Sequence, residues 1–312
     1  MNRHELADMV SLNLAALEAG RTRFFEHTVE SPPFRAHLDA VRLDPLPGPT
    51  LGTHEVPAST LVGRVDEAYL IYRWKGAAYP TIIYHHGNRE HPFDMSSGAK
   101  NTFRTILAAG TRDIEANLVA IRAPFHRMPT REYLQRMGTI ENFLAMLAAS
   151  TALVEQIVYE CRQGGCGRIL VAGISLGGTV ANLHRTYRNS ADLYVPLLAG
   201  TTQGDTFTRS AYRKLMGRAG RRNPEEVQDL LNFTSQFLRV RDNNVFPLLA
   251  RYDQYVPFEF QEDCYVDRPV RVMERGHITA ALSPELLRRH VVDVLKGQAP
   301  GLDEEVHPIP LQ

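Results

Sequence analysis

The chain has 312 residues, of which 44% are hydrophobic and 22% charged, a composition typical of a globular protein with a sizeable core. Its 35 Lys and Arg residues balance 35 Asp and Glu residues, so we expect no net field that attracts nucleic acid or an anionic membrane. No apolar run approaches the roughly 18 residues that span a bilayer, and so no transmembrane segment is predicted. Residues 1–18 include Glu5 and Asp8 and lack the apolar stretch of a secretory signal. A cytoplasmic location is therefore expected.

Residues 1–65 are predicted to form a helix and a proline-rich connector, both packed on the domain that follows. Leu6, Val10, Leu14 and Leu17 recur at helical spacing, and Gly20 can end the helix. Six prolines between positions 32 and 57 follow, and they argue against a regular helix in this stretch.

From Glu67 onward, short apolar runs alternate with longer amphipathic stretches. Strands are predicted at 68–74, 81–84, 117–121, 168–172, 193–198, 245–250 and 270–273, and helices at 100–109, 130–161 and after Ser283-Pro284. In the last helix, Leu286, Leu287 and Val291 are predicted to be buried. This alternation predicts an α/β fold with a mostly parallel sheet, covered by helices on both faces, built from residues 66–199 and 245–300.

Ser175 lies at the centre of the sequence Gly173-Ile-Ser-Leu-Gly177, between a predicted strand and a predicted helix. A serine at such a sharp strand-to-helix turn is lifted clear of the sheet, and a Cβ two residues to either side would clash. The turn also directs a helix N-terminus at the reacting centre, where negative charge is favoured. We predict that Ser175 is a catalytic nucleophile.

The partners of such a serine follow it in the order acid, then base. Asp253 follows one predicted strand, and His277 follows the next. A serine hydroxyl needs an adjacent base, and a carboxylate on the far nitrogen of the histidine fixes its tautomer. We therefore predict the triad Ser175, His277 and Asp253.

Other residues compete for these two roles. His290 falls inside the last predicted helix, and His184 and His126 precede the acid in the chain. Asp205, after the strand at 193–198, is the alternative acid. His277 and Asp253 are preferred because each ends a strand in the required order.

Two backbone N–H groups should stabilise the oxyanion of an acyl-transfer reaction. One is predicted to be that of Leu176, directly after the nucleophile, and the other to come from the loop His85-His86-Gly87-Asn88-Arg89. Asn88 is the first candidate and Arg89 the second. His86 is predicted to brace this loop through hydrogen bonds.

These motifs together resemble the α/β-hydrolase superfamily, in particular serine esterases and lipases. The resemblance covers roughly residues 66–297 and implies an eight-stranded, mostly parallel sheet and hydrolysis without a cofactor. Residues 200–244 fall where this superfamily often inserts a cap; they contain a helix start at Asn223-Pro224 and a basic cluster from Arg209 to Arg222. One departure is the Asn88-Arg89 pair, which replaces a glycine run.

The sequence therefore predicts a serine hydrolase that cleaves a carboxylic ester of a small-molecule acyl substrate, with no cofactor, no metal and no nucleic-acid partner. A serine peptidase or amidase with the same triad is the first alternative, and a non-catalytic binding protein of the same fold is the second. Ester is preferred by analogy with the fold alone. Oligomeric state and acyl specificity are left open.

Overall fold

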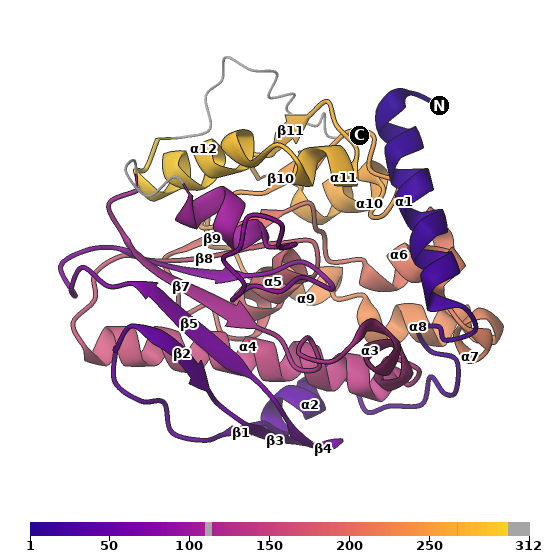
Figure 1. Ribbon diagram of the computed structural model, residues 1–312, viewed down its shortest axis with the longest axis horizontal. Helices are drawn as coiled ribbons and strands as arrows, with labels where there is room; N and C mark the ends of the chain where they lie inside the picture. The colour runs from indigo at the N-terminus through magenta and orange to yellow at the C-terminus, as the bar shows by residue number, and fades with distance from the viewer. Residues whose placement is uncertain (110–113, 267, 299–312) are drawn as a thin grey trace.

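The computed structural model describes residues 1–109, 114–266 and 268–298. Its centre is an eight-stranded sheet in the order β11-β10-β9-β8-β6-β7-β5-β2 (Figure 1). The first six strands of this order, β11 to β7, pair with their neighbours in parallel. At the edge, β5 pairs antiparallel with β7, and β2 pairs antiparallel with β5. The predicted mostly parallel, eight-stranded sheet is confirmed. Its strands are β2 (Gly52–Glu55), β5 (Ala68–Arg73), β6 (Thr81–His85), β7 (Asn117–Arg122), β8 (Ile169–Ile174), β9 (Leu193–Leu197), β10 (Leu248–Ala250) and β11 (Arg271–Met273).

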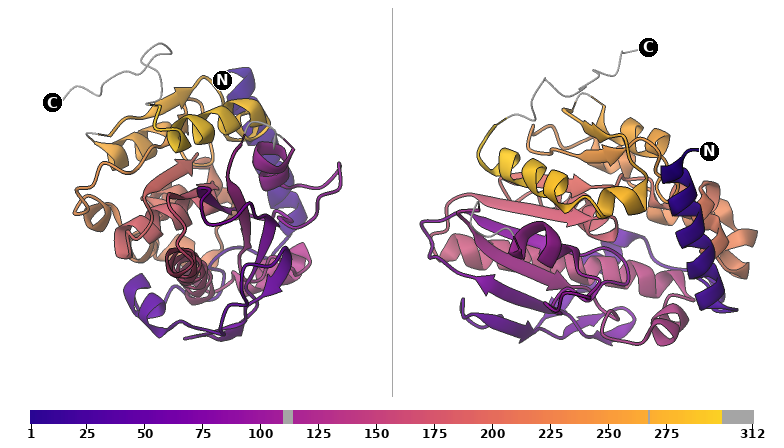
Figure 2. Two further views of the ribbon diagram at one scale, coloured as in Figure 1. Left: turned by 90° about the vertical axis from the view of Figure 1, so that its left-hand side faces the viewer. Right: turned by 45° about the horizontal axis from the view of Figure 1, so that its top comes forward.

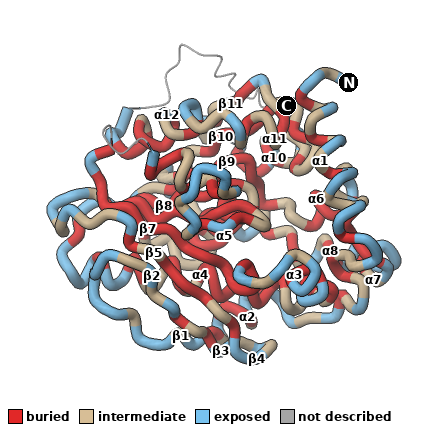
Figure 3. The backbone as a smooth tube through the Cα atoms, in the orientation of Figure 1, coloured by how far each residue is buried: buried red, intermediate tan, exposed pale blue. Residues whose placement is uncertain are grey.

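Helices cover both faces of this sheet, as predicted. Successive side chains of a central strand point to opposite faces, and each face is covered by its own apolar core. Ile83 of β6 points into one core with α4 (Ile140–Gln163) and α5 (Leu176–Tyr187). Ile82 and Tyr84 point into the other core with α12 (Pro284–Leu295) and the short π-helix η1 (Arg104–Ala108). Figure 3 shows the sheet as the most continuously buried part of the chain.

Helix α1 (Arg3–Ala19) runs across one end of the sheet (Figures 1 and 2). The helix was predicted, but its spaced apolar residues lie on the exposed side: Leu14 is 61% exposed and Leu17 is 76% exposed. The buried side carries Asp8 and Leu12, both fully buried. Hydrogen bonds from Asp8 to the rest of the protein, described below, explain this orientation.

The proline-rich stretch is more regular than predicted. It contains α2 (Phe34–Ala40) and parts of a small three-stranded sheet, and β2 joins the main sheet beside β5. The main sheet therefore begins before residue 66. The prolines are tolerated because they lie between elements; Pro33, for example, directly precedes α2. The small sheet consists of β1 (Arg42–Leu43), β3 (Ala58–Thr60) and β4 (Gly63–Val65).

The helix predicted over 130–161 is two helices, α3 (Thr130–Arg136) and α4, separated at Gly138. Thr139 begins α4 by accepting a hydrogen bond from the N–H of Asn142. Among the described helices, α4 alone has the length and apolarity to cross a bilayer, and 72% of its most apolar stretch is buried inside the fold. In α12, Leu287 and Val291 are buried as predicted, but Leu286 is 41% exposed.

Residues 200–244, the predicted cap, connect β9 to β10 through short helices. They are α6 (Gln203–Arg209), the 3₁₀ helix η3 (Ala211–Leu215), α7 (Arg218–Arg222), α8 (Pro224–Leu231) and α9 (Thr234–Phe237). Of these, η3 packs against α1, α6, α7 and α8 lie on the same side of the molecule as α1, and α9 packs against α5 (Figure 1). Three further short helices follow β10 and β11: α10 (Phe258–Glu262), the 3₁₀ helix η4 (Asp263–Tyr265) and α11 (His277–Ala281).

Candidate active site

Ser175 occupies the turn between β8 and α5 with a φ of 53°. This left-handed conformation is uncommon for a residue with a Cβ and marks local strain at the turn. A Cβ on Gly173 would collide with the backbone of Gly177, and a Cβ on Gly177 would collide with the carbonyl of His85. Both positions therefore need glycine for the turn to close over the end of β6.

Asp253 and His277 follow the neighbouring parallel strands β10 and β11, and the structure brings them together. The Nδ1–H of His277 donates to Oδ2 of Asp253 at 2.7 Å, and both side chains are buried. The other oxygen of Asp253 accepts the N–H groups of Tyr255 and Val256, each at 2.8 Å. These bonds fix the carboxylate and leave Nε2 of a neutral His277 ring unprotonated.

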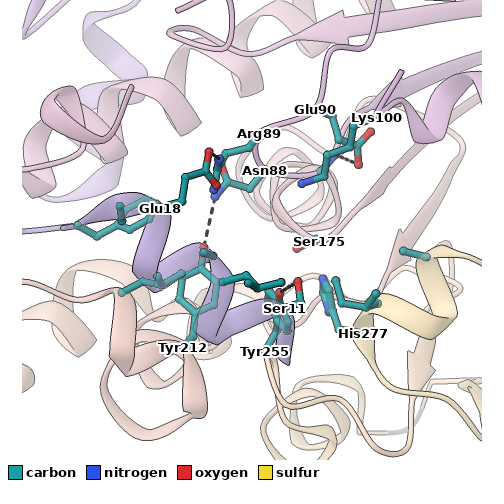
Figure 4. A pocket seen from close by; sticks show the side chains of 18 of the residues that line it. Ser11, Glu18, Asn88, Arg89, Glu90, Lys100, Ser175, Tyr212, Tyr255 and His277 are labelled. Atoms are coloured by element: carbon teal, nitrogen blue, oxygen red, sulfur yellow. Dashed lines mark hydrogen bonds and ion pairs between the residues drawn. The ribbon is translucent and has the colours of Figure 1, made fainter. Parts of the chain in front are cut away.

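Ser175 and His277 line one pocket of about 430 Å³ (Figure 4). No hydrogen bond joins their two side chains in this structure, in which the imidazole of His277 is bonded to Asp253. Burial lowers the pKa of His277, but the charge and hydrogen bond of Asp253 raise it above its ordinary value overall. The charge of Asp8 adds to this increase, and that of Lys100 opposes it. Asp253 is thus placed to stabilise the imidazolium that forms when His277 accepts a proton.

The other candidates for base and acid have different partners. His184 contacts Glu155 at 2.9 Å, and His290 contacts a backbone carbonyl at 2.9 Å. His126 donates to a neighbouring carbonyl at 3.0 Å. Asp205 accepts hydrogen bonds from side chains of the cap helices. None of these four residues lines the 430 Å³ pocket.

The loop after β6 contains the second candidate oxyanion donor. Asn88 and Ser175 line the same pocket, and α5 begins at Leu176. Within the described part of the chain, the N–H groups of Asn88 and Leu176 have no other hydrogen-bond partner. Both groups are thus free to donate to an oxyanion. Arg89, the second candidate, has a φ of 61°.

Several side chains brace this loop. Buried Glu90 accepts from the N–H of Gly87 at 3.2 Å and from Thr102 through both its N–H and its hydroxyl. The hydroxyl of Tyr133 donates to Oδ1 of Asn88 at 2.7 Å. His86 donates from Nδ1 to the carbonyl of Gly87 at 2.6 Å and accepts at Nε2 from a backbone N–H at 3.0 Å. The loop is therefore held in place before any substrate arrives.

Helix α1 contributes to the site in a way that no sequence motif indicates. Oδ2 of Asp8 accepts the N–H groups of His277 at 2.8 Å and Gln254 at 3.0 Å, and Oδ1 accepts that of Ile278 at 2.9 Å. A Cβ on Gly276 would lie 2.7 Å from Oδ2 of Asp8. One buried carboxylate thus ties together the two loops that carry the predicted acid and base.

Tyr255 is a second residue of the site with no role predicted from the sequence. Its ring stacks on that of His277, with centroids 4.7 Å apart and planes inclined by 14°. Its hydroxyl donates to Ser11 of α1 at 2.8 Å (Figure 4). The imidazole is therefore held both by Asp253 and by an aromatic face.

Across residues 1–109, 114–266 and 268–298, no group of three or more His, Cys, Asp and Glu side chains could hold a metal ion. The three cysteines, Cys161, Cys166 and Cys264, are buried and unpaired.

The eight-stranded sheet and its strand-to-helix turn at Ser175 form an α/β-hydrolase fold. The family model described as alpha/beta hydrolase domain containing 18 matches residues 112–219. No curated protein sequence matches the chain.

Solved structures of hydrolases share the fold at low sequence identity. The Pyrococcus furiosus esterase Pf2001 is 14% identical, with a TM-score of 0.52, over 89% of this chain and 98% of that chain. A cold-adapted esterase from an Arctic intertidal metagenomic library is 13% identical, with a TM-score of 0.53, over 83% and 97%. The acylaminoacyl peptidase of Pyrococcus horikoshii is 15% identical, with a TM-score of 0.57, over 85% of this chain and 43% of that chain.

Proposed function

We propose that this protein is a serine hydrolase that cleaves a carboxylic ester through an acyl-enzyme, with Ser175 as nucleophile, His277 as base and Asp253 as the acid of the triad. The observation that carries the proposal is the 2.7 Å bond from His277 to Asp253, in a pocket that the strained Ser175 also lines. A small-molecule acyl substrate and a cytoplasmic location are parts of the same proposal.

In the first half of the reaction, Oγ of Ser175 attacks the ester carbonyl carbon and its proton passes to Nε2 of His277. The N–H groups of Leu176 and Asn88 stabilise the oxyanion, helped by the N-terminus of α5. The carbon–oxygen bond to the alcohol then breaks, and His277 returns its proton to the leaving oxygen. Water attacks the acyl-enzyme by the same route, which releases the acid and restores Ser175.

The alternative is a serine peptidase or amidase with the same three residues. The fold likeness to an acylaminoacyl peptidase keeps this alternative open, but this chain covers only 43% of that protein. Ester cleavage is preferred because the two esterases are covered over nearly their whole length. A non-catalytic binding protein would have no need for the buried, bonded Asp253–His277 pair.

A fluorophosphonate probe tests the proposal directly, since it labels an activated serine covalently. We expect labelling of the full chain, complete loss with Ser175→Ala, and unchanged labelling with Ser96→Ala, which alters an exposed serine in a loop. No labelling of the folded wild-type chain would favour the binding protein. Faster cleavage of peptide anilides than of p-nitrophenyl esters would favour the amidase.

A further inference from the structure

A second, much smaller pocket meets Ser175 on another side. Its volume is about 30 Å³, compared with about 430 Å³ for the pocket described above. Ser175, Asn88, Tyr212 and Tyr255 line both pockets and so form the boundary between them. A substrate bound at Ser175 would therefore place one part in a large space and the other part in a small one.

One side of the small pocket is aromatic and tightly packed, and Gln203 and Thr206 add polar groups to its lining. Phe143 and Phe207 are 3% and 1% exposed, and their rings meet edge to face with centroids 5.6 Å apart. Phe207 also packs against Tyr212 at 5.2 Å, and Val256 is held by its backbone bond to Asp253. Aromatic side chains fixed on several sides cannot move aside without loss of packing, so the size of this pocket is set by the core.

The position of His277 determines which part of an ester enters which pocket. His277 must return its proton to the leaving oxygen, so the alcohol portion has to lie beside the imidazole. His277 lines the large pocket but not the small one, whereas Leu176, which carries a predicted oxyanion donor, lines only the small one. The alcohol portion thus belongs in the large pocket and the acyl chain in the small one.

We propose, on the basis of the function proposed above, that the substrates are esters of a short acyl group, acetyl or propionyl, with a much larger alcohol. On the same measure the small pocket has less than a tenth of the volume of the large one, about 30 against about 430 Å³, so a methyl or ethyl group suits it better than a longer chain. In the reaction, Ser175 Oγ forms its bond to the short acyl carbon as the bond to the large alcohol breaks. The proton of Ser175 leaves with that alcohol through His277, and water then releases the short acid.

Two isomeric esters give the sharpest test, because they differ only in which side of the scissile bond is long. Hexyl acetate and ethyl hexanoate have the same atoms, and release of acid from each can be followed by pH-stat titration. We expect kcat/KM for hexyl acetate to exceed that for ethyl hexanoate at least tenfold. A ratio near one, or in favour of ethyl hexanoate, would overturn the assignment of the pockets.

Enlarged variants test the same point with the alcohol held constant. Phe207→Leu and the milder Val256→Ala should each raise the ratio of p-nitrophenyl hexanoate to p-nitrophenyl acetate hydrolysis at least fivefold. Leu14→Ala, a matched truncation in the large pocket, should leave this ratio unchanged. An unchanged ratio in folded Val256→Ala would contradict the inference. If fluorophosphonate does not label Ser175, the proposed function itself fails; labelling combined with no preference for short acyl groups removes only this inference.

Discussion

Removal of the Asp8 carboxylate should weaken both the fold and the reaction, although Asp8 lies on a helix remote in sequence from the predicted triad. Asp8 is fully buried and accepts backbone N–H groups of residues 254, 277 and 278 at 2.8–3.0 Å. Asp8→Ala would leave three donors facing an empty site. We therefore regard Asp8 as a positioning residue for the loops that carry Asp253 and His277.

The size of the effect follows from these bonds. A hydrogen bond to a charged group contributes about 1.5–3 kcal/mol, but three bonds to one carboxylate are not additive. We expect Asp8→Ala to lower the free energy of unfolding by about 3–5 kcal/mol. Asp8→Asn keeps one accepting oxygen and should cost roughly half as much. A shift of His277 by about 1 Å would lower kcat/KM by about 100-fold.

The pH profile separates positioning from general destabilisation. Burial lowers the pKa of His277, and so does the charge of Lys100. The charges of Asp253 and Asp8 raise this pKa. The base must be neutral, so the wild-type kcat/KM should rise with pH around a value above the ordinary 6.5 of histidine. Loss of the Asp8 charge lowers the pKa of His277, and this rise should move to lower pH.

The assay is hydrolysis of p-nitrophenyl acetate from pH 5 to 9 by Asp8→Asn, with denaturant unfolding of the same protein. Glu30→Gln, which removes a carboxylate from an exposed position outside the helices and strands, is the matched control and should change neither quantity. If Asp8→Asn retained the wild-type kcat/KM and the wild-type pH profile, Asp8 would have no positioning role.

Three further predictions concern the predicted catalytic residues and their supports. His277→Ala should lower kcat by several orders of magnitude in steady-state assays, and a loss below tenfold would remove this residue from the mechanism. Gly177→Ala should prevent the turn at the nucleophile from closing and lower the melting temperature, whereas Gly167→Ala, with no atom within 4 Å of an added Cβ, should have the wild-type value. Glu90→Ala should lower kcat about 10–100-fold without a matching rise in KM, because it frees the N–H of Gly87 and loosens the loop that carries Asn88. If the variant and the wild type had the same kcat, this loop would not depend on Glu90.

The sequence by itself determined the elements whose signals are local. Apolar runs of strand length that alternate with helical stretches are typical of a parallel sheet with helices on both faces. The sheet and the helices on its two faces were therefore predictable. The glycines around Ser175 predicted a close approach of backbones, and the structure shows the contacts that exclude a Cβ there. The order of Asp253 and His277 after successive strands was enough to propose them as partners, because parallel strands end at one edge of a sheet.

Only the tertiary structure decided which face of α1 is buried and how large the space around Ser175 is. The spacing of Leu6, Val10, Leu14 and Leu17 reports a periodic apolar face, but it does not report that Asp8, on the other face, meets three unpaired backbone donors. Those donors come from loops about 250 residues away in sequence, and hydrogen bonding of buried donors outweighs the exposure of a few leucines. The two pockets likewise depend on side chains from distant segments meeting at one serine, and such packing has no signature within any single stretch of sequence.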